Sequence, residues 1–236
     1  MSKTRLLLNS NDRDVNIYPN SNQFRVSYVE NYRSVSHMCV RYWWIMDSSY
    51  IVNSFNNVFT LNDGVVAYTI TLTPGNYSTT TLTSELEAKL NASGSIVTWT
   101  VTYNSTTAKF TIAATGAVTY NWASYPLCAK LLGFAASDLT NTTVVSNTIP
   151  SLNTTNYYML VIKNLPSIVR NKKPYHLLIP NNVPQGSLNT PVNGLVLDSI
   201  HFGANVDFSY LDIEIRDENY NLVDLRNANW QIELEF

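Results

Sequence analysis

The residue types best suited to catalysis or metal binding are scattered along this chain. The three histidines, His37, His176 and His201, lie in separate segments, and none has a second histidine at metal-binding spacing. No serine stands in the G-x-S-x-G turn of a hydrolase, and no glycine-rich phosphate loop is present. We therefore interpret the histidines as structural, and we expect no catalytic residues, no metal site and no cofactor.

One acidic stretch begins like a calcium-binding loop, with Asp217, Asn219 and Asn221 at alternate positions. The sixth position is Leu222, where the sharp turn of such a loop needs glycine. The twelfth is Ala228, where a bidentate glutamate is required. A polar turn between two strands explains these residues better.

Two carboxylates, Asp212 and Glu214, share one face of a predicted strand. Carboxylates on the exposed face of a strand are normally solvated, so we interpret this pair as part of the surface.

Two groups of residues are candidates for contacts with a partner. Arg170, Lys172 and Lys173 form the one basic cluster; such clusters are usually solvated loops, and a contact with another subunit or a polyanion is the alternative.

Trp43 and Trp44 follow Tyr42 in a heavily aromatic strand. Because alternate residues of a strand face opposite sides, at least one ring must face away from its own core. We expect it to pack under a loop, an insertion or a neighbouring subunit.

The composition favours a β-rich protein that packs against other copies. Of 236 residues, 45% are hydrophobic and only 14% charged, and the formal net charge is -2. Abundant Asn, Thr and Ser replace the missing charges, and neutral amides cost less to bury than charges do. An AT-rich genome, in which Asn codons are common, is an alternative source of this bias. The charge does not indicate sequence-specific nucleic-acid binding, and no apolar run is long enough for a membrane span.

The two cysteines, Cys39 and Cys128, lie far apart in apolar segments, and we expect both to be buried, reduced thiols. The run of three leucines near the N-terminus is too short for the apolar region of a signal peptide. We therefore expect the protein to stay in the compartment where it is made.

The residue patterns predict an all-β protein with one helical insertion. Apolar–polar alternation predicts strands at 24–29, 211–215 and 230–236, and further strands are predicted at 35–46, which is almost continuously apolar, at 157–163 and at 195–200. A strand over 65–73, a Pro-Gly turn, a helix over 79–90 with leucines four residues apart, and a hairpin over 96–114 form a tight unit. A second short helix is predicted to begin at Pro126 and end at Gly133. Residues 135–156 are expected to form a long loop or a weak hairpin, and the proline-rich 166–191 to be mainly loop.

These elements predict a single jelly-roll β-sandwich of two antiparallel sheets. Residues 22–236 are expected to form one domain, with the helix–hairpin insertion near 74–134. Residues 1–21 are expected to form an N-terminal arm or an edge strand. In the first alternative the triplet Leu6–Leu8 pairs with another subunit; in the second it belongs to its own sheet.

Several motifs along the chain carry a resemblance to known proteins. They are Asp12-Arg13-Asp14 with 18–26, the turn 74–78 with its helix, 131–134, 208–217, 223–225 and 230–236. Together they resemble one viral protein family, the minor capsid proteins of eukaryotic double-stranded DNA viruses. The likeness is to the single jelly-roll penton proteins of virophages, polinton-like viruses and related large viruses, and it covers most of the chain.

The resemblance implies a structural protein of the virion that forms homopentamers at the five-fold vertices of an icosahedral capsid. Its partners would be its own copies and the major capsid protein, and no catalytic residues carry over. The alternative is a carbohydrate-binding jelly roll, such as a fibre head or a lectin-like protein. An exposed ring among Trp43, Trp44, Trp99, Trp122 and Trp230 would favour that alternative.

Overall fold

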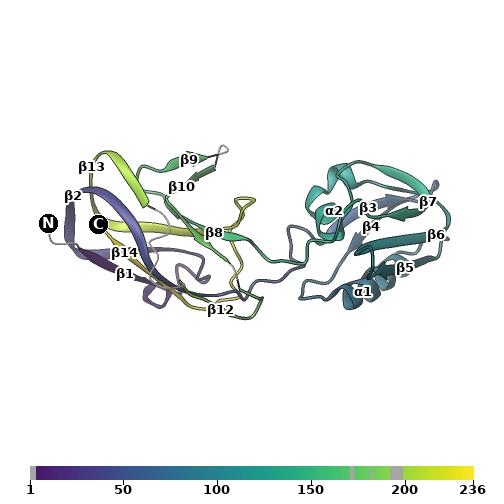
Figure 1. The fold of residues 1–236 in the computed structure, drawn as a ribbon, viewed down its shortest axis with the longest axis horizontal. Coiled ribbons are helices and arrows are strands. Elements are labelled where there is room, and N and C mark those ends of the chain that lie inside the picture. The colour runs from purple at the N-terminus through teal and green to yellow at the C-terminus, as the bar shows by residue number, and fades with distance from the viewer. Residues whose placement is uncertain (1–3, 171–172, 182, 192–198) are drawn as a thin grey trace. The chain divides into compact units, whose positions relative to one another are not determined.

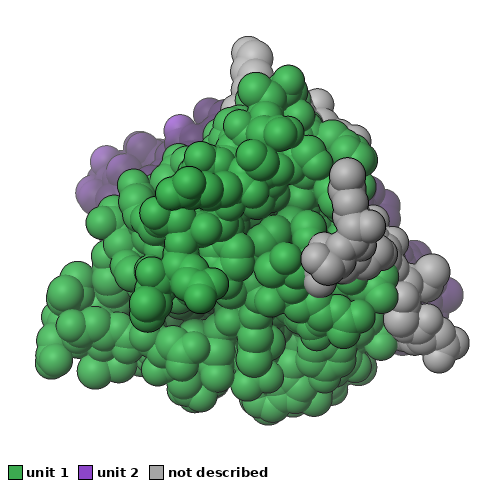
Figure 2. Space-filling view, turned by 90° about the vertical axis from the view of Figure 1, so that its left-hand side faces the viewer, with its two compact units in different colours: residues 1–49, 154–236 green, residues 50–153 purple. Residues whose placement is uncertain are grey.

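The chain folds into two compact units, each with its own core. The computed structural model describes residues 4–170, 173–181, 183–191 and 199–236. Unit 1 comprises residues 1–49 and 154–236, and unit 2 comprises residues 50–153 (Figures 1 and 2). The sequence had predicted one domain with an insertion near 74–134. The insertion is larger than predicted, and it has a sheet and a core of its own. Neither of the two segments that join the units is rich in proline or glycine.

Unit 1 is built on one continuous antiparallel sheet of seven strands. Their order is β1-β14-β2-β13-β8-β11, and β12 also pairs with β2. The strands are β1 (Arg5–Asn9), β2 (Gln23–Met46), β8 (Tyr157–Ile162), β11 (Leu177–Pro180), β12 (Leu188–Asn189), β13 (Ser199–Arg216) and β14 (Trp230–Glu235). A short 3-10 helix, η1 (Ser10–Asp12), follows β1.

Two long strands, β2 and β13, turn this sheet into a sandwich. The first half of β2 pairs with the end of β13, while its second half pairs with β14. Between these parts the β2–β13 register shifts three times, from His201 to Tyr210, and such irregularities bend strands (Figure 1). Both layers therefore enclose one core, to which Leu8, Trp230, Tyr158 and Leu211 all contribute. The predicted antiparallel β-sandwich is confirmed.

The short strand β1 belongs to the sheet of its own chain. Arg5 to Asn9 pair with β14, and the side chains of Leu6 and Leu8 are buried in the core of unit 1. Of the two alternatives for this segment, the structure adopts the edge strand.

The proline-rich segment after β8 contains more strand than the sequence predicts. It holds β11, β12 and a separate hairpin of β9 (Ile168–Arg170) and β10 (Lys173–Tyr175). Pro174 lies in this two-stranded hairpin, and Pro180 ends β11 at the edge of the main sheet. Edge positions tolerate proline because one side of the strand makes no ladder bonds.

Unit 2 has a five-stranded antiparallel sheet with two helices. The strand order is β4-β3-β6-β5, and β7 pairs with β6. The elements are β3 (Val58–Asn62), β4 (Ala67–Thr71), α1 (Thr79–Asn91), β5 (Trp99–Asn104), β6 (Lys109–Tyr120), η2 (Trp122–Ser124), α2 (Pro126–Leu132) and β7 (Leu139–Val145). Strand β7 lies in the stretch that the sequence predicts as loop or weak hairpin.

The two predicted helices of unit 2 are confirmed. Leu82, Leu86 and Leu90 form the buried face of α1, and Ser78 caps its first turn together with Thr81. Helix α2 ends at Gly133, whose φ of 80° is in the left-handed region. A Cβ there would lie 2.4 Å from the carbonyl oxygen of Thr148, so this turn requires glycine.

The two cysteines are free and buried, Cys39 in unit 1 and Cys128 in unit 2. Burial raises the pKa of the Cys128 thiol to about 12, which keeps it protonated and unreactive.

Candidate functional site: the outer surface of unit 1

Alternate side chains of β13 point away from the core of unit 1 and carry a row of polar and charged groups. Leu211, Ile213 and Ile215 point into the core. The residues between them form what we call the β13 face, defined by Tyr210, Asp212, Glu214 and Arg216.

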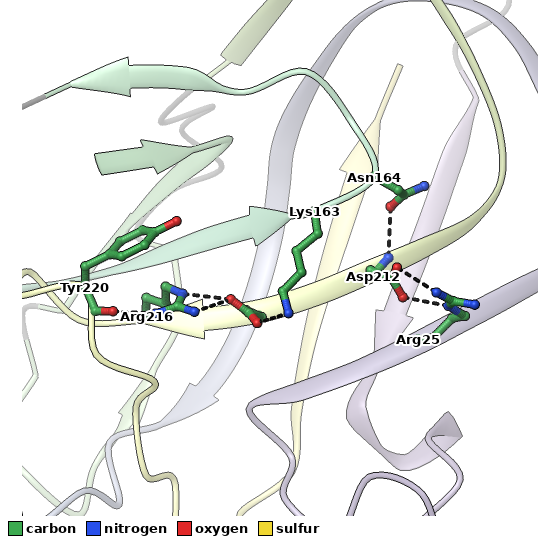
Figure 3. A network of polar contacts seen from close by, with 7 residues as sticks. Arg25, Lys163, Asn164, Asp212, Arg216 and Tyr220 are labelled. Atoms are coloured by element: carbon green, nitrogen blue, oxygen red, sulfur yellow. Dashed lines mark hydrogen bonds and ion pairs between the residues drawn. The ribbon is translucent and has the colours of Figure 1, made fainter. Parts of the chain in front are cut away.

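Asp212 is held by the neighbouring strand and the end of β8. It pairs with Arg25 of β2, directly opposite in the register, through bonds of 2.6 and 2.8 Å (Figure 3). The Arg25 guanidinium also lies over the ring of Tyr210, 4.5 Å from its centre. The backbone N–H of Asp212 donates to Asn164 Oδ1 at 3.0 Å. The hydrogen bond with Asp212 raises the pKa of Arg25 above its ordinary value.

Glu214 is a buried carboxylate between two cations. Only 2% of this residue is exposed. Lys163 pairs with one carboxylate oxygen, and the Arg216 guanidinium contacts the other with Nε at 2.7 Å and Nη2 at 2.6 Å. Arg216 in turn lies over the ring of Tyr220, 4.3 Å from its centre (Figure 3). A buried charge requires such partners, because an unpaired one is costly to desolvate.

This arrangement corrects the interpretation of Asp212 and Glu214 as solvated surface carboxylates. The Asp212 side chain is one-quarter exposed, whereas that of Glu214 is almost completely covered. Alternation places both on one face, but it does not show what covers that face. Both are held in ion pairs, so the pair is a structural network.

The basic cluster lies on the β9–β10 hairpin. Lys173 in β10 donates from Nζ to the backbone oxygen of Glu218 in the turn after β13. Arg170 ends β9, but its side chain lies outside the described residues, as does Lys172. The structure thus gives one of the three cations an intramolecular partner, and a contact of this cluster with another molecule stays a prediction.

The aromatic strand segment divides its rings between the core and the surface. Trp43 is 2% exposed and lies in the core of unit 1, so it is unavailable to a partner. Tyr42 is exposed and Trp44 partly exposed on the opposite side. Of the five tryptophans, Trp99, Trp122 and Trp230 are also buried, which leaves Trp44 as the accessible one.

Tyr42 and Trp44 belong to an apolar area on the outer side of the sheet. Exposed Leu7 and Tyr42 flank Glu233 of β14 in the register, and Met46 stands opposite Leu188 of β12. We call this area the β2 face and define it by Leu7, Tyr42, Trp44, Met46 and Leu188.

Asp47 organises the place where the chain leaves unit 1 and returns. It is 1% exposed, and both carboxylate oxygens accept hydrogen bonds. Ser49 Oγ donates at 3.0 Å and Tyr158 Oη at 3.2 Å to Oδ1, while Thr154 Oγ1 at 2.6 Å and Asn181 Nδ2 at 3.1 Å donate to Oδ2. Sequence reasoning missed this residue, whose one signal is a carboxylate directly after an apolar strand.

The structure separates the histidines into two kinds. His176 is buried and accepts a hydrogen bond from the Ile162 N–H at Nδ1, at 3.0 Å. Its Nε2 lies 3.2 Å from the Leu165 carbonyl oxygen, to which it donates. His37 and His201, far apart in sequence, are brought side by side on β2 and β13. Within the described parts of the chain, no group of three or more His, Cys, Asp or Glu could hold a metal ion.

Comparison with solved structures gives the architecture a known counterpart. The chain matches the crystal structure of the selenomethionine-labelled mavirus penton protein with a TM-score of 0.51. The match covers 100% of this chain and 99% of that chain, at 10% sequence identity. The fold is similar to that of a viral penton protein. The sandwich is therefore the predicted jelly roll, and at this identity the similarity is one of fold.

Two other comparisons are negative. No protein-family model matches the chain, and no curated protein matches it significantly. Among the described residues, no helix is both long and apolar enough to cross a membrane.

Proposed function

We propose that this chain is the penton protein of an icosahedral virus capsid, a structural protein that forms homopentamers at the five-fold vertices. The observation that carries the proposal is the fold similarity to the mavirus penton protein across nearly the whole of both chains, unit 2 included. The proposal also places the protein in the virion, next to the major capsid protein.

The β2 face supports self-association. It places five large side chains, two of them aromatic, on the outer side of the sheet, in a protein with few charges to repel other copies. Aromatic residues and methionine are enriched at the centres of protein interfaces. In a closed ring this face would meet a different surface of the next copy, because cyclic pentamers use heterologous contacts.

Light scattering on the purified, chromatographed protein tests self-association, and electron microscopy shows its symmetry. We expect a mass five times that of the chain and five-fold class averages. The variant Tyr42→Glu places a charge on the β2 face and is expected to yield monomers. Val65→Glu changes an exposed apolar residue of unit 2 and serves as the matched control. A monomeric wild-type protein would contradict self-association, and a pentameric Y42E would exclude this face as the interface.

A contact with the major capsid protein requires a separate experiment. Cross-linking of intact virions followed by mass spectrometry should recover links between this chain and that protein. The lysines of the basic cluster, Lys172 and Lys173, are the positions to inspect. Absence of the chain from purified virions would refute the proposed location.

Carbohydrate binding is a second candidate, and one observation favours it. Trp44 and Tyr42 present rings on a sheet face beside Gln231, which stands opposite Trp44 in the register. Rings with a neighbouring amide can stack on and hydrogen-bond to a sugar. A glycan array with wild-type protein and Trp44→Ala tests this: binding that the substitution abolishes would support the candidate, and an unbound array would reject it.

A further inference from the structure

The pair His37 and His201 is the cluster of chemically active side chains that the proposed function leaves unused. The two residues are direct partners in the antiparallel register of β2 and β13. Their ring centres are 5.8 Å apart, and the ring planes differ by 24°. The fold thus places two imidazoles face to face, although 163 residues separate them in the sequence (201 − 37 − 1).

Both rings are accessible. His201 is exposed and His37 partly exposed. Ser36 Oγ lies 3.5 Å from Nδ1 of His37. In the described parts of the chain, no other polar contact to the four ring nitrogens is seen. Because both rings are open to solvent, burial of apolar surface explains little of their stacking. Their ring nitrogens are available to a ligand.

The separation of the rings suits a shared metal ion. Two imidazoles on one tetrahedral zinc, with Zn–N bonds of about 2.0 Å, have their ring centres about 5 Å apart. The observed 5.8 Å is close to this value, but the two ring planes are nearly parallel, so both side chains must turn until one nitrogen of each ring points at a common ion. Directly opposed strand residues already have Cβ atoms about 5 Å apart.

We propose that His37 and His201 form a binding site for a late first-row divalent cation, with Zn²⁺, Ni²⁺ and Cu²⁺ as the chemical class. Neutral imidazole nitrogens suit these metals, whereas Mg²⁺ and Ca²⁺ select oxygen ligands. The chain would supply two ligands, and water would complete the coordination. The site goes beyond the proposed capsid role and does not depend on it.

The position of the pair gives the site a structural consequence. His201 is the last residue of the regular register before the shift to Val206. A metal held by both histidines would cross-link β2 to β13 at the point where the strands begin to bend. Binding in the folded state alone would then stabilise unit 1.

Titration of the tag-free protein with Zn²⁺, followed by calorimetry, tests the proposal. We expect one Zn²⁺ per chain, with loss of binding in both His37→Gln and His201→Gln. Ser36→Ala removes the hydroxyl beside His37 without removing a ligand, and this matched control should bind as the wild type does. Retention on a Ni²⁺ column should follow the same order. Thermal unfolding without metal establishes that each variant is folded.

An NMR measurement on the wild-type protein keeps the test independent of the variants. Zn²⁺ should shift the ring signals of His37 and His201 and leave those of buried His176 in place. The proposal is overturned if the wild type does not bind Zn²⁺, if both glutamine variants bind it equally well, or if the two ring signals do not respond. Oligomeric mass is measured separately, so failure here leaves the capsid proposal standing.

Discussion

Tyr158 Oη lies 3.2 Å from Asp47 Oδ1, and this buried hydrogen bond joins the end of β2 to the start of β8. Burial, reinforced by the negative charge of Asp47, raises the pKa of the Tyr158 hydroxyl, which therefore remains a donor. Because the same carboxylate also binds Thr154, it connects the exit from unit 1 to the return.

We expect Asp47→Ala to lower the free energy of unfolding of unit 1 by about 2–4 kcal/mol, because several buried donors lose their acceptor. Urea unfolding measures the change. Glu30→Ala, which removes an exposed carboxylate from β2, is the control and should have little effect. Equal stability of the two variants would show that the Asp47 bonds contribute nothing net.

The stability of unit 1 should depend on pH through His176. Burial lowers the pKa of this residue from its ordinary value near 6.5 to about 4. Between these values the unfolded chain binds a proton that the folded protein does not. The free energy of unfolding should therefore be fully retained above pH 6.5 and fall as the pH drops toward 4, by at most about 3 kcal/mol. Urea unfolding across this range gives the slope, and His176→Gln should flatten it. An unchanged slope in the variant would assign the effect to other groups.

Two carboxylates on the β13 face should differ in their contribution to stability. Glu214→Gln leaves Lys163 and Arg216 without their buried counter-charge and is expected to cost about 3 kcal/mol. Asp212→Asn breaks a pair whose arginine is half exposed, so a much smaller loss is expected. Chemical denaturation of the two variants under identical conditions makes the comparison. A larger loss for D212N would reverse the assignment.

The two units should respond separately to core substitutions. Leu86→Ala opens a cavity in the core of unit 2 and is expected to destabilise that unit by about 2–5 kcal/mol. Hydrogen exchange read by mass spectrometry should accelerate over residues 50–153. Leu160→Ala, its counterpart in the core of unit 1, should accelerate exchange in the remaining segments. Faster exchange throughout the chain in both variants would mean that the units unfold together.

Local patterns predicted the elements well where one side of an element is buried. The leucine spacing defined α1 to within one residue, and alternation located β14 and the end of β13. The predicted strands 24–29 and 35–46 are parts of one 24-residue strand. The sequence divides this strand in two because apolar and polar residues do not alternate regularly in its bent middle.

Long-range features could not be predicted in the same way. The pairing of His37 with His201 and the cover over Glu214 depend on which strands become neighbours, and no spacing within a segment encodes that. The division into two units also left no trace in composition, since neither of the segments that join the units is rich in proline or glycine.

The hydrogen bonds of Asp47 make the insertion of unit 2 independent of the fold of unit 1, because they hold the two points where the chain leaves and re-enters unit 1. Thr154 Oγ1 lies 2.6 Å from Asp47 Oδ2, so the two ends of the inserted chain are fastened together by unit 1 itself. A short turn could close that gap, and a different folded module could occupy it, without altering the sandwich. A scaffold joined in this way could accept a different insertion while the core of unit 1 stays the same.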